Sequence, residues 1–178
     1  MKVVNVHQRL LHVSPERVGA LIDSLASPAD ALWPGRAWPR MKFDRPLGVG
    51  AAGGHGPLGY VVEAYTPGQS VRFRFTAPKG FDGWHGFEVL EATSVHCVLE
   101  HRLEMNATGR AAFTWPLAIR HLHDACVEDA LSQAQVALGL EPRSVPWPSR
   151  VRLLHRIMAA RSRTGSGGHS GRARGHAG

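Results

Sequence analysis

Two histidines occupy positions where an imidazole could do chemistry. His85 precedes Phe87 on one alternating, strand-like segment, and His101 lies between Leu99 and Leu103 on the next. A histidine on an inward, apolar strand face can orient a hydroxyl or carbonyl of a ligand, and it can move a proton when its pKa lies near neutrality. The alternative is a core histidine with a satisfied hydrogen bond. The pattern alone leaves ligand contact, acid–base catalysis and core packing open.

A glycine-rich segment, Gly48–Gly53, matches the letters of the dinucleotide fingerprint G-x-G-x-x-G. That chemistry requires a preceding strand and a following helix whose N-terminus receives the pyrophosphate. Here the segment continues through His55 into Pro57 and then a strand, so we expect a turn-forming connection over Gly48–Gly59 and no cofactor. Its glycines favour a flexible loop near a pocket mouth, with His55 as a third candidate ligand contact.

A histidine and three acids lie close together near the C-terminal end of the chain body: His123, Asp124, Glu128 and Asp129. His121 and His123 are two residues apart, so on a helix they project to different sides and cannot easily share a metal. Asp124 and Glu128 share a face, where like charges repel. We therefore predict no metal site, and a helix that His123 or an acid anchors to the sheet.

The hydrophobic periodicity predicts a strand, two short helices, a series of strands and one long helix. Ser14-Pro15-Glu16 begins the first helix, and a second short helix is expected near Asp30–Trp33. The expected strands are Val3–Val13, Met41–Pro46, Tyr60–Tyr65, Ser70–Ala77, His85–Ala92 and Ser94–Met105, and the long helix is Trp115–Leu138, closed by Gly139. Because strands and helices are segregated, the pattern favours an α+β fold with an antiparallel sheet around a pocket.

Three phrases carry a resemblance to a known family: WPRMKFDRPLGVGAAGGHGPLGY (Trp38–Tyr60), PGQSVRFRFTAPKGFDGWHGFEV (Pro67–Val89) and LHDACVEDAL (Leu122–Leu131). Over Val3–Leu140 the chain resembles the SRPBCC superfamily, which includes START-related lipid carriers and bacterial polyketide cyclases. The resemblance implies an α+β helix-grip fold, in which a curved antiparallel sheet wraps around a long C-terminal helix, with two short helices after the first strand. It also implies a deep internal cavity, and it does not imply an activity.

In such a fold the core and the cavity wall are one surface, so large apolar groups and the histidines become candidate ligand contacts. These candidates are Trp38, Met41, His55, Tyr60, Phe73, Phe75, His85, Phe87 and His101. The first hypothesis is a soluble carrier or sensor for a hydrophobic small molecule. The alternative is an enzyme of the polyketide cyclase or aromatase type, in which His85 or His101 transfers the proton.

The chain of 178 residues carries a net charge of +7 that is unevenly distributed. Arg143–Gly178 holds 8 arginines and no acid, whereas the preceding residues hold 13 Lys/Arg against 14 Asp/Glu. We expect a ligand-binding domain at 1–140, a Pro-containing linker and short basic helix at 141–161, and a disordered tail at 162–178. The tail either only solubilises the chain or contacts a membrane surface or acidic partner weakly; no specific nucleic-acid binding is expected. Two cysteines without metal or disulfide spacing, and no signal peptide, favour a cytoplasmic location.

Overall fold

The protein is built around one antiparallel sheet. The computed structural model describes residues 1–90 and 93–165, and the chain divides into two compact units, Met1–Val145 and Pro146–Gly178. The described strands of the first unit form a seven-stranded sheet in the order β1-β7-β6-β5-β4-β3-β2. They are β1 (Lys2–Leu11), β2 (Lys42–Phe43), β3 (Ala52–His55), β4 (Leu58–Thr66), β5 (Ser70–Ala77), β6 (Phe81–Leu90) and β7 (Cys97–Ala107). The predicted α+β class with segregated strands and helices is confirmed.

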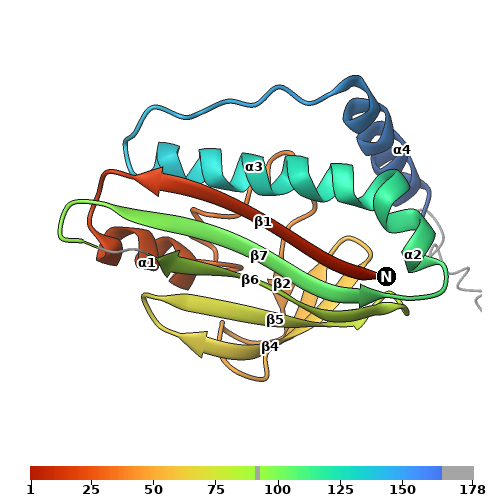
Figure 1. Cartoon of the computed structure of the whole chain (residues 1–178), viewed down its shortest axis with the longest axis horizontal. Coiled ribbons are helices and arrows are strands. Elements are labelled where there is room, and N and C mark those ends of the chain that lie inside the picture. Colours follow the sequence, from red (N-terminus) through yellow and green to blue (C-terminus); the bar gives the residue numbers. More distant parts are fainter. Residues whose placement is uncertain (91–92, 166–178) are drawn as a thin grey trace, which may run out of the picture. The chain divides into compact units, whose positions relative to one another are not determined.

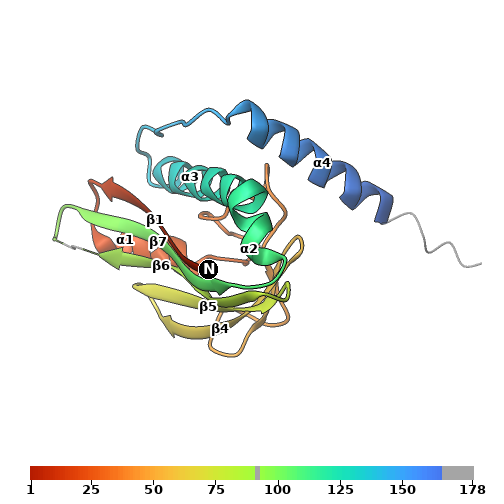
Figure 2. The same cartoon turned by 45° about the vertical axis from the view of Figure 1, so that its right-hand side comes forward.

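The sheet curves, and one long helix lies across its concave side above β1 and β7 (Figure 1; Figure 2). This helical segment begins as α2 (Ala111–Thr114), widens into the π-helical turn η1 (Trp115–Ile119) and continues as α3 (Arg120–Ala137). The π-turn holds Pro116, whose ring and missing N–H disturb regular α-helical hydrogen bonding. The predicted stop is confirmed, because Gly139 has a φ of 75°, which glycine adopts without strain.

The strand faces follow the predicted alternation. Val71, Phe73 and Phe75 of β5 are buried, and so are the alternate residues of β7 from Cys97 to Met105. Against this face α3 buries its own apolar residues, namely Cys126, Val127, Ala130, Leu131 and Ala134. The core therefore lies between the concave face of the sheet and one side of α3.

The region after the first strand differs from the prediction in one element. Helix α1 (Pro15–Asp23) begins at the expected proline, but the second short helix expected near Asp30–Trp33 is a series of turns. The carboxylate of Asp30 accepts hydrogen bonds from the backbone N–H groups of Ala26, Leu32 and Trp33, at 2.8–3.1 Å. A short acidic side chain that bonds nearby N–H groups offers the backbone an alternative to helix, and here that alternative prevails.

The glycine-rich segment expected to be turns only, Gly48–Gly59, contains strand β3 and the start of β4. A Cβ on Gly53 would overlap the carbonyl oxygen of Lys42, and one on Gly54 would overlap that of Leu58. These glycines let β2 and β4 approach β3 more closely than any side chain would allow. A connection between strands was predicted here, but its pairing in the sheet was not.

The second unit contains helix α4 (Ser149–Gly165), which runs four residues past the end predicted for the short basic helix. Inside this unit the rings of Trp147 and His155 lie 4.8 Å apart. The predicted disordered tail, 162–178, overlaps α4 at its first four residues, and the rest of it falls outside the described residues. In the part of the chain that the structure describes, no helix combines the length and apolarity that crossing a membrane requires.

Candidate functional site

A row of aromatic and imidazole rings crosses the interior between the sheet and α3. His85 on β6 and His101 on β7 both face inward, with exposed fractions of 4% and 2%. The ring centroids of Tyr60 and His85 are 4.9 Å apart, those of His85 and His101 are 5.6 Å apart, and those of His101 and His123 are 5.1 Å apart. The predicted inward facing of both histidines is confirmed, and α3 adds a third imidazole to the row.

Several nitrogens of these imidazoles lack partners. Nδ1 of His85 lies 3.4 Å from Nε2 of His101, which is a long hydrogen bond. Nε2 of His85, Nδ1 of His101 and both nitrogens of His123 are buried without a hydrogen-bond partner among the described residues. Buried polar atoms are nearly always satisfied in folded proteins, and an unsatisfied one costs about 1–3 kcal/mol. A row of such atoms is unusual for a core, and a bound water or ligand molecule would satisfy it.

Burial also sets the charge of the row. It lowers the pKa of His85 and of His101 well below the ordinary value of 6.5, and the neighbouring imidazoles lower both further. Burial likewise lowers the pKa of His123, although Asp124 opposes the shift. These imidazoles are consequently neutral at physiological pH, when each can donate one hydrogen bond and accept another.

The walls of the row are the aromatic residues that the sequence singled out. Phe75 stacks on the ring of His85 with centroids 4.9 Å apart, Phe73 lies 5.1 Å from it, and Phe87 meets His101 edge-on at 4.7 Å. Seven of the nine predicted contacts thus join one ring cluster: His55, Tyr60, Phe73, Phe75, His85, Phe87 and His101.

The other two predicted contacts, Trp38 and Met41, are also buried. The indole nitrogen of Trp38 donates a hydrogen bond of 2.7 Å to Asp129 on α3. Trp38 thus ties the segment after α1 to the long helix, which is a positioning contact in addition to any contact with a ligand.

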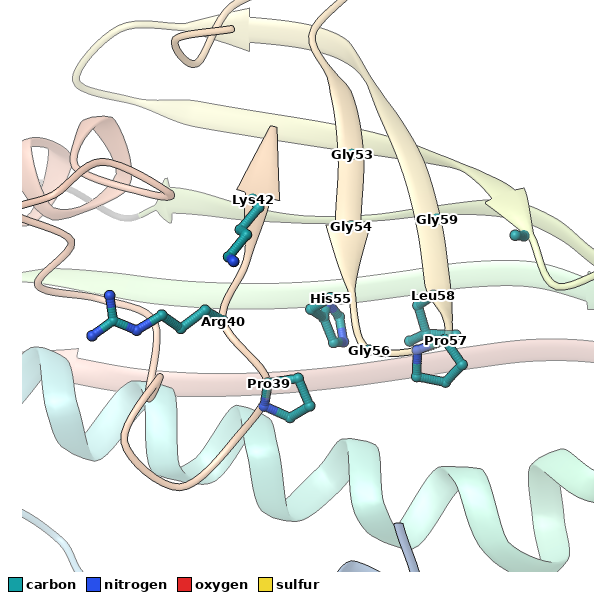
Figure 3. A pocket seen from close by; sticks show the side chains of 11 residues that line it. Pro39, Arg40, Lys42, Gly53, Gly54, His55, Gly56, Pro57, Leu58 and Gly59 are labelled. Carbon is teal, nitrogen blue, oxygen red and sulfur yellow. The ribbon is translucent and has the colours of Figure 1, made fainter. Parts of the chain in front are cut away.

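An open depression of about 760 Å³ lies at the β2–β3–β4 edge of the sheet (Figure 3). His55 lines it, and its Nδ1 lies 2.9 Å from the hydroxyl oxygen of Tyr60, the first ring of the row. Burial lowers the pKa of His55 to about 4. Arg40 and Lys42 line the same depression, whose described lining contains no acidic residue. The depression therefore combines two cations with a neutral imidazole.

A second cluster, joining β1 to α3, was missed in part by the sequence analysis. His7 Nδ1 lies 2.8 Å from Glu128 Oε1, and Arg9 Nη2 donates to Glu128 Oε2 at 2.7 Å. On the preceding turn of α3, Asp124 Oδ1 accepts from Asn5 Nδ2 at 2.8 Å and lies 3.3 Å from His7 Nε2. The prediction that an acid anchors the helix to the sheet is confirmed, and the strand partners are the new finding.

These partners carry a signal that strand periodicity could have supplied. Asn5, His7 and Arg9 alternate, and they share the inward face with buried Val3 and Leu11. The outward face carries Val4, Val6 and Leu10, with exposed fractions of 52%, 39% and 52%. Between Val3 and Leu11 the usual rule is thus reversed, because polar residues point inward and valines point outward.

Electrostatics in the β1–α3 cluster differ from those of the ring row. Burial alone would lower the pKa of His7, but hydrogen bonds to Asp124 and Glu128 outweigh it, so the pKa of His7 is raised. Burial would raise the pKa of Asp124, yet the adjacent His123, His7 and Asn5 lower it well below its ordinary value. Asp124 is therefore a carboxylate, and it meets an imidazole of the ring row on one side and His7 on the other.

Solved structures of other proteins share this arrangement of a sheet and a long helix. Norcoclaurine synthase from Thalictrum flavum, in complex with a transition-state analogue, matches with a TM-score of 0.59 at 15% identity, over 78% of this chain and 96% of that one. CalU16 from Micromonospora echinospora matches with a TM-score of 0.55 at 12% identity, over 90% of this chain and 86% of that one. The chain has a helix-grip fold.

Ara h 8.0201 shares this helix-grip fold, with a TM-score of 0.54 at 10% identity, over 78% of this chain and 99% of that one. No family model and no curated protein matches the sequence. At these identities the likeness shows the fold alone, and it confirms the predicted helix-grip fold. The function must be argued from the site.

Proposed function

We propose that this helix-grip protein binds a small, largely apolar molecule between its sheet and α3, and that neutral imidazoles hydrogen-bond the polar groups of that molecule. The observation that carries the proposal is the row of buried imidazole nitrogens without partners, from His85 through His101 to His123. A wall of aromatic rings around such nitrogens suits a ligand that is mostly apolar and carries hydroxyl or carbonyl oxygens.

The depression lined by His55 supports this proposal and narrows the class of ligand. Arg40 and Lys42 favour a molecule with an acidic or carbonyl-rich end. The acidic or carbonyl-rich end of the ligand would remain in the depression, while its aromatic or polycyclic body would extend along Tyr60 toward His85. Norcoclaurine synthase from Thalictrum flavum has also been solved in complex with dopamine and hydroxybenzaldehyde, so this fold accepts small oxygenated aromatic compounds elsewhere.

Small molecules carried by the natively purified protein test the proposal. Denaturing extraction followed by mass spectrometry should release a near-stoichiometric apolar compound from the wild type. His85→Phe and His101→Phe should retain less of it, because each removes the polar contacts and keeps the aromatic volume. His12→Ala, which changes an exposed histidine, is the matched control. Equal retention by both Phe variants, or an empty wild type that also fails to bind a panel of oxygenated aromatic compounds, would overturn the proposal.

A second function is proton transfer on the bound molecule, as in a polyketide cyclase or aromatase. It is favoured by one observation, the 3.4 Å approach of His85 Nδ1 to His101 Nε2, because two neutral imidazoles in contact can pass a proton between donor and acceptor positions. Incubation of the identified ligand with wild type should then give a product that His85→Phe does not form. Binding without any product would leave the carrier or sensor function as the answer.

A further inference from the structure

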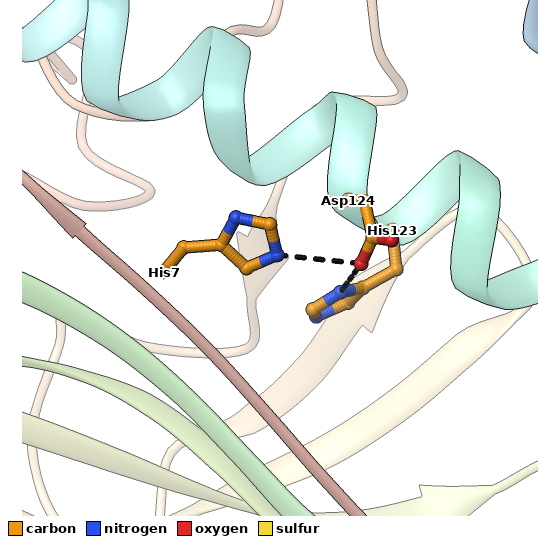
Figure 4. A group of neighbouring side chains, drawn as sticks. All are labelled: His7, His123 and Asp124. Atoms are coloured by element: carbon orange, nitrogen blue, oxygen red, sulfur yellow. Dashed lines mark hydrogen bonds and ion pairs between the residues drawn. The ribbon is translucent and has the colours of Figure 1, made fainter.

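We propose that His7, His123 and Asp124 form a binding site for a divalent transition-metal ion of the zinc type. The proposal goes beyond ligand binding by the ring row. The three side chains come from two elements: His7 from β1, and His123 and Asp124 from α3 (Figure 4). Each offers one ligand atom, and these three atoms all lie within 4.8 Å of one another.

Two of the three ligand-atom separations are close to those of a tetrahedral metal site, and the third is within 4.8 Å. His7 Nε2 lies 3.3 Å from Asp124 Oδ1, and His123 Nδ1 lies 3.7 Å from the same oxygen. Zinc bonds to nitrogen and oxygen of about 2.0–2.2 Å place two ligand atoms of a tetrahedral site about 3.4 Å apart. Figure 4 shows both imidazole rings joined to this carboxylate oxygen by dashed lines.

Independent evidence that the site awaits a partner comes from His123. Both of its ring nitrogens are buried without a hydrogen-bond partner in the described part of the chain. Its side chain is only 14% exposed, and Nδ1 is directed at Asp124. A metal ion would give this nitrogen a bond, whereas the fold gives it only the 3.7 Å contact with Asp124.

Residues around the three ligands provide the support that metal-bound side chains usually have. Glu128 contacts His7 on the ring nitrogen opposite the proposed ligand atom, at 2.8 Å, and Arg9 fixes Glu128 in turn at 2.7 Å. A carboxylate that accepts from the second nitrogen of a metal-bound histidine orients the ring and raises its basicity. Asn5 donates to Asp124 at 2.8 Å and holds the carboxylate in place.

Two histidines and one carboxylate make an appropriate donor set for Zn²⁺, and three protein ligands leave one position of a four-coordinate site for water or a ligand atom. The prediction of no metal site considered only neighbours along the helix. His121 was the partner judged unsuitable for His123, whereas the partner that the fold supplies is His7, more than a hundred residues away in the chain.

Zinc titration of the untagged, full-length protein tests the site. After chelator treatment, competition with a chromophoric chelator should show one equivalent of tightly bound Zn²⁺. His7→Ala and His123→Ala should each weaken that equivalent at least tenfold. Glu128→Gln should weaken it about 10- to 100-fold, as loss of a carboxylate behind a metal-bound histidine does elsewhere. His12→Ala is the matched control and should bind as wild type does, and the tail histidines stay unchanged in every variant.

Two further measurements keep the test decisive if a variant folds poorly. Co²⁺ added to the wild type should give the visible absorption of a four-coordinate ion. Zinc at a hundredfold excess over its Kd should raise the melting temperature of the wild type by about 5 °C or more, because it binds only the folded state.

A wild type that binds no tight equivalent, or a His7→Ala/His123→Ala double variant that binds as tightly as wild type, would overturn the proposal. Neither outcome would affect the proposed ligand function, which small-molecule extraction tests separately.

Discussion

The stability of a His85→Phe variant distinguishes a histidine with an unsatisfied nitrogen from an ordinary core histidine with satisfied hydrogen bonds. His85 lies in a box of rings, with Tyr60, Phe73 and Phe75 at centroid distances of 4.9–5.1 Å. Phenylalanine fits such a box with a small increase in volume and no polar atom. The substitution removes the unpartnered Nε2 of His85, but it also leaves Nε2 of His101 without its long hydrogen bond.

The loss of His85 Nε2 and the loss of the hydrogen bond to His101 should change the free energy of unfolding by similar amounts at pH 7, in opposite directions. Removing one unsatisfied buried nitrogen gains about 1–3 kcal/mol, and leaving another unsatisfied costs a similar amount. The free energy of unfolding of His85→Phe should therefore lie within about 1 kcal/mol of wild type at pH 7. Ordinary core histidines with satisfied hydrogen bonds would give a loss of several kcal/mol instead.

At lower pH the two proteins should diverge. The pKa of buried His85 lies well below 6.5 in the folded state, whereas in the unfolded chain it is near 6.5. Below pH 6.5 the unfolded chain therefore binds a proton that the folded chain does not, and stability falls as pH falls. Wild type therefore loses about 1.4 kcal/mol of unfolding free energy per pH unit below 6.5 through His85, and His85→Phe does not. Relative to wild type, the variant should gain about 2 kcal/mol of stability between pH 7 and pH 5.

Urea unfolding at pH 7, 6 and 5 measures both quantities. Val62→Ala, which removes methyl groups from a buried position without a titratable group, is the control and should lose the same stability at each pH. The reasoning is refuted if His85→Phe is more than about 2 kcal/mol less stable at pH 7, or if its stability runs parallel to that of wild type as the pH falls.

Three further predictions concern the framework that holds the site. Leu131→Ala should cost about 2–5 kcal/mol in urea unfolding, because its side chain is fully buried on the inner face of α3; a loss below about 1 kcal/mol would contradict this packing. The pKa of Tyr65 is raised to about 12 by burial and by Asp23, so phenolate absorbance should titrate near pH 12, and stability should fall between pH 10 and 12 as the unfolded chain loses its proton first. Asp23→Asn should move that titration toward 10, and an unchanged midpoint would exclude the pairing. Gly19→Ala should cost about 1–3 kcal/mol, because the new Cβ would overlap the carbonyl oxygen of Gly68; equal melting temperatures would show that α1 is not held this closely.

Much of the fold was predictable because it depends on local patterns. Period-two alternation fixed the inner face of Ser70–Ala77 and of the strand that carries His101, and a proline start and a glycine stop marked the helices. The segment near Asp30–Trp33 defeated the same reasoning, because hydrogen bonds from one aspartate side chain replaced helical ones. Local patterns cannot weigh that competition.

Only part of the candidate site could be predicted from local sequence patterns. That His85 and His101 face inward follows from alternation, and their aromatic neighbours follow from it too. That His123 completes the row does not, since it depends on the position of α3 over the sheet. The contact of His7 with Asp124 and Glu128 joins residues more than a hundred positions apart.

The sequence by itself therefore determined most of the elements, the apolar faces of the central strands and the inward orientation of His85 and His101, because these properties arise from neighbours a few residues apart. Only the tertiary structure decided which of those groups meet. The curvature of the sheet and the placement of α3 bring His7, His123 and Asp124 together and leave the buried imidazoles without partners among the described residues. The chemistry of the site rests on contacts that chain spacing does not encode.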